Sequence, residues 1–336
     1  MIEAHGLTKR YGPKTAVDDI TFTVRPGIVT GFLGPNGAGK STTMRMIMGL
    51  DRPTAGAVTV NGLPYSHHRS PLTEVGALLE ARAVHPGRSA EQHLRVLAAT
   101  HGFPDRRVGE VIELTGLESV ARKRVGGFSL GMGQRLGIAS ALLGDPSTLI
   151  LDEPVNGLDP EGVLWVRNLA RYLASQGRTV FLSSHLMSEV ALTADHVIVI
   201  GKGKILADTS VKDFTAGASR KTVRVSTPGA AALAAAIERA GGTAVAADGE
   251  ASVGRHAADD ALAAAPAVPG TLEVTGLDAP TIGELALTAG VALHELTPVV
   301  STLEQAYMEL TKDSVEYRTE DVSHVDAATT TTGGQR

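Results

Sequence analysis

The segment Gly34–Ser41 combines glycines, a lysine and a hydroxyl at a spacing that suits phosphate binding. It fits the pattern G-x-x-x-x-G-K-[ST]. Glycines let the backbone curl so that successive N–H groups face one anion, and a following helix N-terminus adds positive potential. We expect Lys40 to reach the β- and γ-phosphates of a nucleotide and Ser41 to ligate Mg²⁺. The alternative is a glycine-rich turn with a surface lysine.

The segments flanking this loop have the patterns that the motif needs. Val29–Leu33 predicts a short buried strand, and Ser41–Leu50 has helical spacing with Met44, Ile47 and Met48 on one side. The predicted nucleotide-binding residues of the loop are Gly34, Pro35, Asn36, Gly37, Ala38, Gly39, Lys40, Ser41 and Thr42.

Two carboxylates follow an apolar run later in the chain. Thr148–Leu151 predicts a strand, which we expect beside the strand of the phosphate loop, and Asp152 and Glu153 come directly after it. Asp152 is expected to hold Mg²⁺ through water. Glu153 is expected to orient and deprotonate a water that attacks the γ-phosphate. The alternative is a strand that ends in two solvated acids.

A second anion-binding device is predicted at Ser129. Spaced glycines and this serine precede a helix predicted over Gln134–Leu143, and free N–H groups at a helix start attract anions. One nucleotide rarely uses two such devices of one chain. The alternative is a capped helix after a flexible turn.

Two further segments add polar groups. Asn156–Pro160 predicts a turn, with Pro160 after Asp159. Thr179–Leu182 predicts a strand that leads into Ser183-Ser184-His185, where His185 can hydrogen-bond a γ-phosphate or its attacking water. The alternative for His185 is a capping residue at a strand end.

The composition limits the class of protein. With 336 residues, 43% of them hydrophobic and 20% charged, the chain has room for two globular domains. The net charge of −5 argues mildly against nucleic acid as the main partner. The absence of cysteine excludes disulfides, thiolate catalysis and cysteine metal sites. Met1–His5 lacks signal-peptide features, and no run of 18 apolar residues occurs. We therefore expect a cytoplasmic protein, peripheral on the inner face of the cell membrane where a membrane partner holds it.

The order of patterns predicts two domains and a tail. Strand-like and helical patterns alternate through residues 1–213, which predicts an α/β fold, and small polar residues at Asp213–Ser219 indicate a boundary. Residues 220–312 predict a smaller α/β unit that ends in an amphipathic closing helix at Ser301–Leu310. Ala257–Pro269 predicts a low-complexity loop, and residues 313–336 a disordered tail.

Together these motifs make residues 1–213 resemble the ATP-binding cassette of ABC transporters. The resemblance implies a P-loop NTPase fold with a mixed-sheet core and a helical subdomain. The family's signature motif, usually Leu-Ser-Gly-Gly-Gln, corresponds here to Phe-Ser-Leu-Gly-Met-Gly-Gln. Ser129, Gly131 and Gln134 stand in the aligning places, with Gly133 beside them.

The resemblance also implies roles for single residues and for partners. Tyr11 matches the aromatic that stacks on adenine, Asp159 the loop that crosses the dimer, and His185 the switch histidine. Asp152 and Glu153 match the Mg²⁺-supporting and catalytic acids. The implied assembly is a head-to-tail homodimer that closes ATP of one copy under Ser129–Gly133 of the other. Separate transmembrane permease subunits are implied, and no nucleic acid.

One residue departs from the family pattern. Glu80 stands where the family usually has a glutamine that helps ligate Mg²⁺ and contacts the membrane subunit. Glu80 keeps an oxygen ligand and adds a negative charge. Similar cassettes of drug and antibiotic exporters often carry glutamate there, and Ala77, Leu78 and Pro86 fit them.

Export of drugs or antibiotics is therefore the expected function. The alternative is a soluble cassette protein acting on ribosomes or nucleic acid, although such proteins carry paired cassettes or a coiled-coil insertion that this chain lacks. A kinase or GTPase fits less well, because no Asn-Lys-x-Asp motif occurs.

Overall fold

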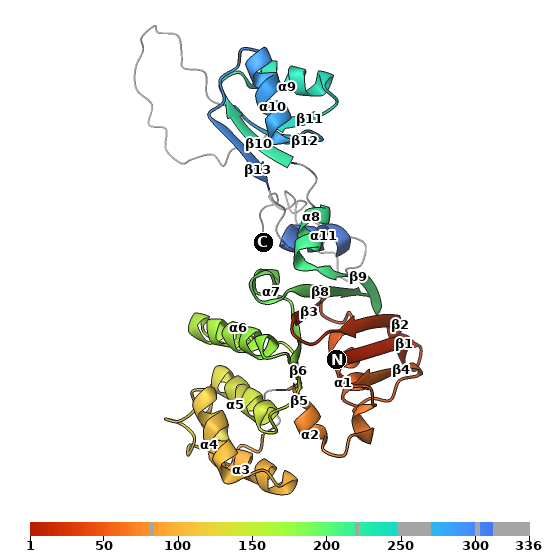
Figure 1. The fold of residues 1–336 in the computed structure, drawn as a ribbon, viewed down its shortest axis with the longest axis vertical. Helices are drawn as coiled ribbons and strands as arrows, with labels where there is room; N and C mark the ends of the chain where they lie inside the picture. Colours follow the sequence, from red (N-terminus) through yellow and green to blue (C-terminus); the bar gives the residue numbers. More distant parts are fainter. Residues whose placement is uncertain (81–83, 219–221, 247–269, 300–302, 312–336) are drawn as a thin grey trace, which may run out of the picture.

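The computed structural model describes residues 1–80, 84–218, 222–246, 270–299 and 303–311 (Figure 1). Its strands are β1 (Ile2–Tyr11), β2 (Lys14–Val24), β3 (Val29–Leu33), β4 (Ala55–Val60), β5 (Val75–Leu78), β6 (Thr148–Leu151), β7 (Thr179–Ser184), β8 (His196–Gly201), β9 (Lys204–Ser210), β10 (Thr222–Thr227), β11 (Thr243–Ala246), β12 (Gly270–Thr275) and β13 (Glu295–Val299). Its α-helices are α1 (Lys40–Ile47), α2 (Pro71–Glu74), α3 (Ala90–His101), α4 (Asp105–Leu114), α5 (Leu130–Leu142), α6 (Pro160–Ser175), α7 (Met187–Thr193), α8 (Val211–Ala218), α9 (Ala230–Arg239), α10 (Ala279–Thr288) and α11 (Leu303–Thr311). The predicted loop Ala257–Pro269 and the predicted tail 313–336 lie outside the described residues.

The central sheet has the strand order β5-β6-β7-β3-β8-β9, parallel except for the edge strand β9. The strand and helix predicted around the phosphate loop are confirmed as β3 and α1. The expectation that β6 lies beside β3 is wrong, because β7 pairs with both strands and separates them. Since the carboxyl ends of parallel strands share one edge of a sheet, the segments after β3, β6 and β7 still meet there.

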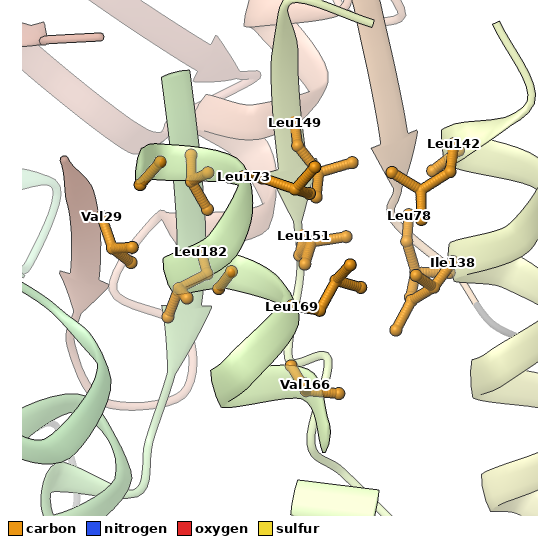
Figure 2. Close-up of a cluster of buried hydrophobic side chains, with 14 of the residues drawn as sticks. Val29, Leu78, Ile138, Leu142, Leu149, Leu151, Val166, Leu169, Leu173 and Leu182 are labelled. Atoms are coloured by element: carbon orange, nitrogen blue, oxygen red, sulfur yellow. The ribbon is translucent and has the colours of Figure 1, made fainter. Parts of the chain in front are cut away.

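Alternating side chains of the central strands pack into two separate hydrophobic cores, one on each face of the sheet. In β6, Leu149 and Leu151 face one core while Ile150 faces the other, as the two-residue period of a strand requires. On the first face, Figure 2 shows these leucines packed against side chains of α6 and α5. On the second face, the rings of Phe32 and Phe181 lie 5.2 Å apart between centroids. The apolar run predicted the strand β6, but it did not show that Ile150 and the two leucines belong to different cores.

A second, antiparallel sheet covers the Phe32 side of the central sheet. Its order is β2-β1-β4. Phe22 of β2 stacks on both Phe32 and Phe181, with ring centroids 6.0 Å away in each case. This sheet also carries Tyr11, at the end of β1, toward the helix α1 that follows the phosphate loop.

A helical layer formed by α3, α4 and α5 lies between β5 and β6 in the chain. Ser89 caps α3 through a capping box with Gln92: its hydroxyl accepts from the Gln92 backbone, and the Gln92 side chain accepts from the Ser89 backbone. Leu94, Val111 and Leu136, one from each helix, are fully buried in the same cluster as the β6 leucines. This layer corresponds to the predicted helical subdomain, and the α/β fold with a mixed sheet is confirmed.

The C-terminal unit repeats a strand–helix–strand arrangement. The chain order β10-α9-β11-β12-α10-β13 forms an antiparallel sheet with the order β11-β12-β10-β13, which is the split βαβ arrangement. Val223, Val225, Leu272 and Val274 face the helices and build a core of their own.

The last described helix, α11, packs on the cassette rather than on the C-terminal unit. It contacts α7 and α8. Its Leu303, Ala306 and Tyr307 belong to the same buried cluster as Phe214 of α8 and the β6 leucines. This differs from the closing helix expected from sequence, because the amphipathic pattern shows that α11 has a buried face but not which core covers it. The domain boundaries at 213 and 312 remain predictions.

Tyr307→Ala is expected to destabilise the cassette by about 3 kcal/mol, since it removes a large ring that is 8% exposed. The measurement is denaturant unfolding followed by the fluorescence of Trp165, the single tryptophan, which packs against the cassette core. Met308→Ala changes a neighbouring side chain that is 59% exposed and serves as the control. Equal stability of the two variants would contradict the packing of α11 on the cassette.

Candidate active site

The phosphate loop winds tightly between β3 and α1, and its glycines permit this. Gly37 and Gly39 have φ of 81° and 114°, in the left-handed region that favours glycine. A Cβ on Gly34 would lie 2.4 Å from the Ile200 carbonyl oxygen, and one on Gly39 would lie 2.7 Å from that of Ala16. Larger residues would therefore distort the cradle, so the loop as built fits a bound phosphate chain.

Lys40 lies inside this loop and is 6% exposed. Its ammonium donates to the carbonyl oxygens of Gly34, at 2.7 Å, and Pro35, at 3.3 Å, and lies 3.8 Å from Glu153 Oε1. Burial lowers the pKa of Lys40, while the charges of Glu153 and Asp152 act in the opposite direction. The charge that can meet a phosphate is thus held between the loop and the two acids.

Glu153 and His185 form a pair at the carboxyl edge of the central sheet. The His185 Nδ1 lies 2.7 Å from Glu153 Oε2, and the His185 backbone N–H lies 3.4 Å from the same oxygen. Because the carboxylate accepts from Nδ1, Nε2 is left for another partner. The His185 side chain is 48% exposed, so that partner can arrive from solvent.

Ser183, a residue for which no role was predicted, joins the two acids. Its hydroxyl donates to Asp152 Oδ1 and accepts the Glu153 backbone N–H at 2.9 Å. Ser183 is fully buried near the end of β7, the strand that separates β6 from β3. The polar triplet Ser183-Ser184-His185 was noted from the sequence, but the position of β7 was needed to place its first serine on Asp152.

The three residues predicted to ligate a metal line one cavity of about 550 Å³: Ser41, Glu80 and Asp152. They supply a hydroxyl and two carboxylates, which are the hard oxygen ligands that Mg²⁺ prefers. The same cavity is lined by Arg45, Met48, Leu50 and Leu79, so its outer wall is partly apolar. The residues present therefore fit Mg²⁺ on the side of the loop that faces Glu80.

Tyr11 lies at the edge of the site with 47% of its surface exposed. Its hydroxyl donates to Asp51 Oδ2 at 2.9 Å, and Asp51 in turn accepts from Arg45 Nε at 2.8 Å. The Lys9 ammonium lies 4.8 Å from the centroid of the Tyr11 ring. The ring is thus held in place by partners from β1 and from the end of α1, and its exposed surface can accept a planar base.

The Ser129 segment lies apart from the phosphate loop. Ser129 caps α5 by accepting the Met132 backbone N–H at 3.2 Å. It lines a cavity of about 380 Å³ together with Leu130 and Gly133, and no loop residue lines that cavity. The two predicted anion-binding devices therefore open into different cavities of one chain.

Gly131 and Asp159 hold the start of two neighbouring helices. A Cβ on Gly131 would lie 3.1 Å from the Gly157 carbonyl oxygen, so the start of α5 packs closely on the Asn156–Pro160 turn. Asp159 caps α6 by accepting the Gly162 backbone N–H at 2.8 Å. This contact fixes the turn beside the Ser129 segment. A role of Asp159 toward a second copy remains a prediction.

Gln134 points away from the cavity that Ser129 lines, which differs from its expected contact with nucleotide. It is 4% exposed, and its Nε2 donates to the Glu153 carbonyl oxygen at 2.7 Å. In the family motif the glutamine is the third residue after the serine, and here that residue is Met132. Gln134 is two residues further, about 200° around the helix, and this rotation turns it inward.

Comparisons with known proteins show which family this chain is similar to. A family model described as ABC transporter matches residues 17–156. The chain is 42% identical over 211 residues to the bacitracin transport ATP-binding protein BcrA of Bacillus licheniformis, covering 62% of this chain and 69% of that protein. It is 36% identical over 208 residues to the lantibiotic transport ATP-binding protein SrtF of Streptococcus pyogenes, covering 62% of this chain and 90% of that protein.

A solved structure of the ATP-binding subunit of an ABC transporter superposes with a TM-score of 0.59 at 27% identity, covering 65% of this chain and 92% of that one. A second family model, a domain of unknown function (DUF8746), matches residues 221–304. Among the described residues, no helix has the length and apolar character needed to cross a membrane.

Proposed function

This chain belongs to the ATP-binding proteins of ABC transporters, and on that basis we propose that it hydrolyses ATP to drive export of an antibiotic or similar compound through separate transmembrane subunits. The observation that carries the proposal is that Glu153 lies within reach of both Lys40 and His185 at one edge of the sheet. The transport proteins for bacitracin and a lantibiotic among its relatives support the choice of cargo class. They support transport over the alternative of action on ribosomes or nucleic acid.

Phosphoryl transfer needs positioning and charge neutralisation more than covalent chemistry. In the proposed reaction, the loop backbone and the start of α1 hold the phosphates, and Lys40 exchanges its carbonyl contacts for phosphate oxygens. Glu153 orients the attacking water and accepts its proton, and His185 contacts the γ-phosphate through Nε2. Tyr11 stacks on the adenine. Ser41, Asp152 and Glu80 would hold Mg²⁺, which would supply positive charge to offset the charge of the phosphates.

A head-to-tail dimer explains the two separate anion-binding devices. The Ser129 segment lines a cavity without any residue of the phosphate loop, so it is placed to receive a nucleotide from another copy. In the proposed dimer, each ATP lies between the loop of one chain and Ser129, Gly131 and Gly133 of the other. ATP then favours the closed dimer, and hydrolysis reopens it. This closing and opening motion can do work on a membrane partner.

The cavity beside Glu80 is the proposed contact with the membrane partner. Leu50 on its wall is 59% exposed, and Met48 and Leu79 extend the apolar lining. A protein segment that fills this cavity would touch Glu80 and thereby the metal side of the site. In the proposed complex the protein lies at the inner face of the membrane, where its permease holds it.

Glu80→Gln is expected to raise the Mg²⁺ concentration for half-maximal ATPase about 2- to 5-fold. The amide keeps an oxygen ligand but removes a negative charge, and charge contacts at exposed sites contribute up to about 1 kcal/mol. A Mg²⁺ titration of ATPase at saturating ATP measures the shift. Glu110→Gln, remote on α4 and half exposed, is the matched control. An unchanged titration would place Glu80 outside the metal site.

Reconstitution tests the proposal as a whole. The chain is co-expressed with a candidate multi-helix membrane protein, purified in detergent as a complex and placed in liposomes with bacitracin or a lantibiotic. The proposal expects ATP-dependent movement of one compound class and none with the Glu153→Gln chain. A stable complex that moves neither compound would refute the cargo class, and the absence of any complex would refute the export function.

A further inference from the structure

The backbone of Glu153 is held on both sides by buried side chains from other elements. Its N–H donates to Ser183 Oγ of β7 at 2.9 Å. Its carbonyl oxygen accepts from Gln134 Nε2 of α5 at 2.7 Å and from the Asn156 backbone N–H at 3.1 Å. Ser183 is fully buried and Gln134 is 4% exposed, so water does not compete for these contacts.

Glu153 needs such support because of its backbone conformation. Its φ is 49°, in the left-handed region that side chains other than glycine rarely adopt. Conformations of this kind persist only where the surroundings over-determine them, and they cluster at functional sites. In this conformation the carboxylate lies 2.7 Å from His185 Nδ1 and 3.8 Å from the Lys40 ammonium.

We propose that Gln134 and Ser183 are positioning residues that hold Glu153 in the orientation needed to accept a proton from water. Gln134 therefore acts on the Glu153 of its own chain rather than on a nucleotide of the partner chain. This inference rests on the proposed role of Glu153. It assigns Gln134 to the hydrolysis step and leaves nucleotide binding across the dimer to Ser129, Gly131 and Gly133.

The inference separates two steps that a single motif would otherwise combine. Loss of the Gln134 hydrogen bond removes one of the three contacts that hold the Glu153 backbone. A misplacement of about 1 Å at a reacting group can slow a reaction about 100-fold. The phosphate loop, Lys40 and the cap of α5 by Ser129 do not involve the Gln134 side chain. ATP binding and dimer closure are therefore expected to persist when hydrolysis slows.

The test compares full-length Gln134→Met and Gln134→Leu with wild type and with Glu153→Gln. Both substitutions remove the donor and keep most of the buried volume, and two variants guard against a folding defect in one. Gln92→Leu is the matched control, because it removes a side-chain to backbone hydrogen bond in α3 without touching the site. The measurements are kcat and KM for ATP, and the ATP-dependent dimer fraction by light scattering.

The expected result is a kcat lowered about 10- to 100-fold in the Gln134 variants, with KM within about twofold of wild type. Their dimer fraction with ATP and Mg²⁺ should rise toward that of Glu153→Gln, while Gln92→Leu behaves as wild type. A raised KM with fewer dimers would overturn the inference, because it would indicate that Gln134 contacts the nucleotide bound by the other chain. Unchanged kcat would also overturn it. If Glu153→Gln itself hydrolyses ATP normally, the proposed role of Glu153 fails, and the inference fails with it.

Discussion

Glu153→Gln is expected to lower ATPase activity about 10²- to 10⁴-fold and to accumulate an ATP-bound dimer. The amide keeps the shape of the side chain and can still accept the hydrogen bond from His185 Nδ1. It cannot accept a proton from the attacking water, and positioned general bases contribute rate factors of this size. Because ATP binding does not need that proton transfer, the nucleotide stays intact and holds the two copies together.

Light scattering with ATP and Mg²⁺ measures the dimer, and phosphate release measures hydrolysis. Glu110→Gln is the matched control, since it makes the same chemical change on the exposed face of α4. A variant that remains monomeric at saturating ATP would argue against nucleotides clasped between two copies. Rapid hydrolysis by a monomer, at a specific rate independent of protein concentration, would show that one chain supplies every residue needed for hydrolysis.

Lys40→Ala is expected to weaken ATP binding about 100-fold or more, and ATPase activity falls with it. The ammonium is the cation held inside the loop, and a preorganised donor to a charged group in such a site is worth a factor of this size. The substitution also leaves Glu153 without its nearby positive charge, which adds repulsion toward the phosphates. Equilibrium binding of ATP, followed by calorimetry, measures the loss directly.

Two further variants separate charge from packing in this test. Lys40→Met keeps most of the buried alkyl chain and should bind ATP as poorly as Lys40→Ala. Lys204→Ala removes a largely exposed lysine that pairs with Asp18, and it should leave binding unchanged. Near-normal ATP binding by Lys40→Met would mean that packing, not charge, explains the role of Lys40.

The sequence predicted which residues form the site better than it predicted how the strands that carry them are arranged. The glycine spacing predicted the phosphate loop, and the apolar runs predicted that Asp152, Glu153 and His185 follow strands. The neighbours of β6 could not be predicted, because strand order depends on long-range pairing that no local pattern encodes. The pairing of β7 with β6 is what brings Ser183 within hydrogen-bonding distance of Asp152, and His185 within that distance of Glu153.

Gln134 shows a different limit of sequence reasoning. The resemblance assigned Gln134 by residue type, but Gln134 lies two positions beyond the place of the family's glutamine. On a helix that displacement is more than half a turn, so the side chain meets Glu153 in the interior instead of solvent. Likewise, the buried pattern of α11 was visible, but its covering core, the cluster with Phe214, was not.

The first and last described strands of the C-terminal unit are neighbours in its sheet. Thr222 and Val299, at its first and last described strands, are direct partners in the antiparallel register. The helices before and after it, α8 and α11, pack on each other. The described ends of the unit, Thr222 and Val299, therefore lie side by side, as do the two helices that flank it in the chain. Because the unit has a core of its own, we expect that it can be replaced or removed without a change in the cores that position the nucleotide site.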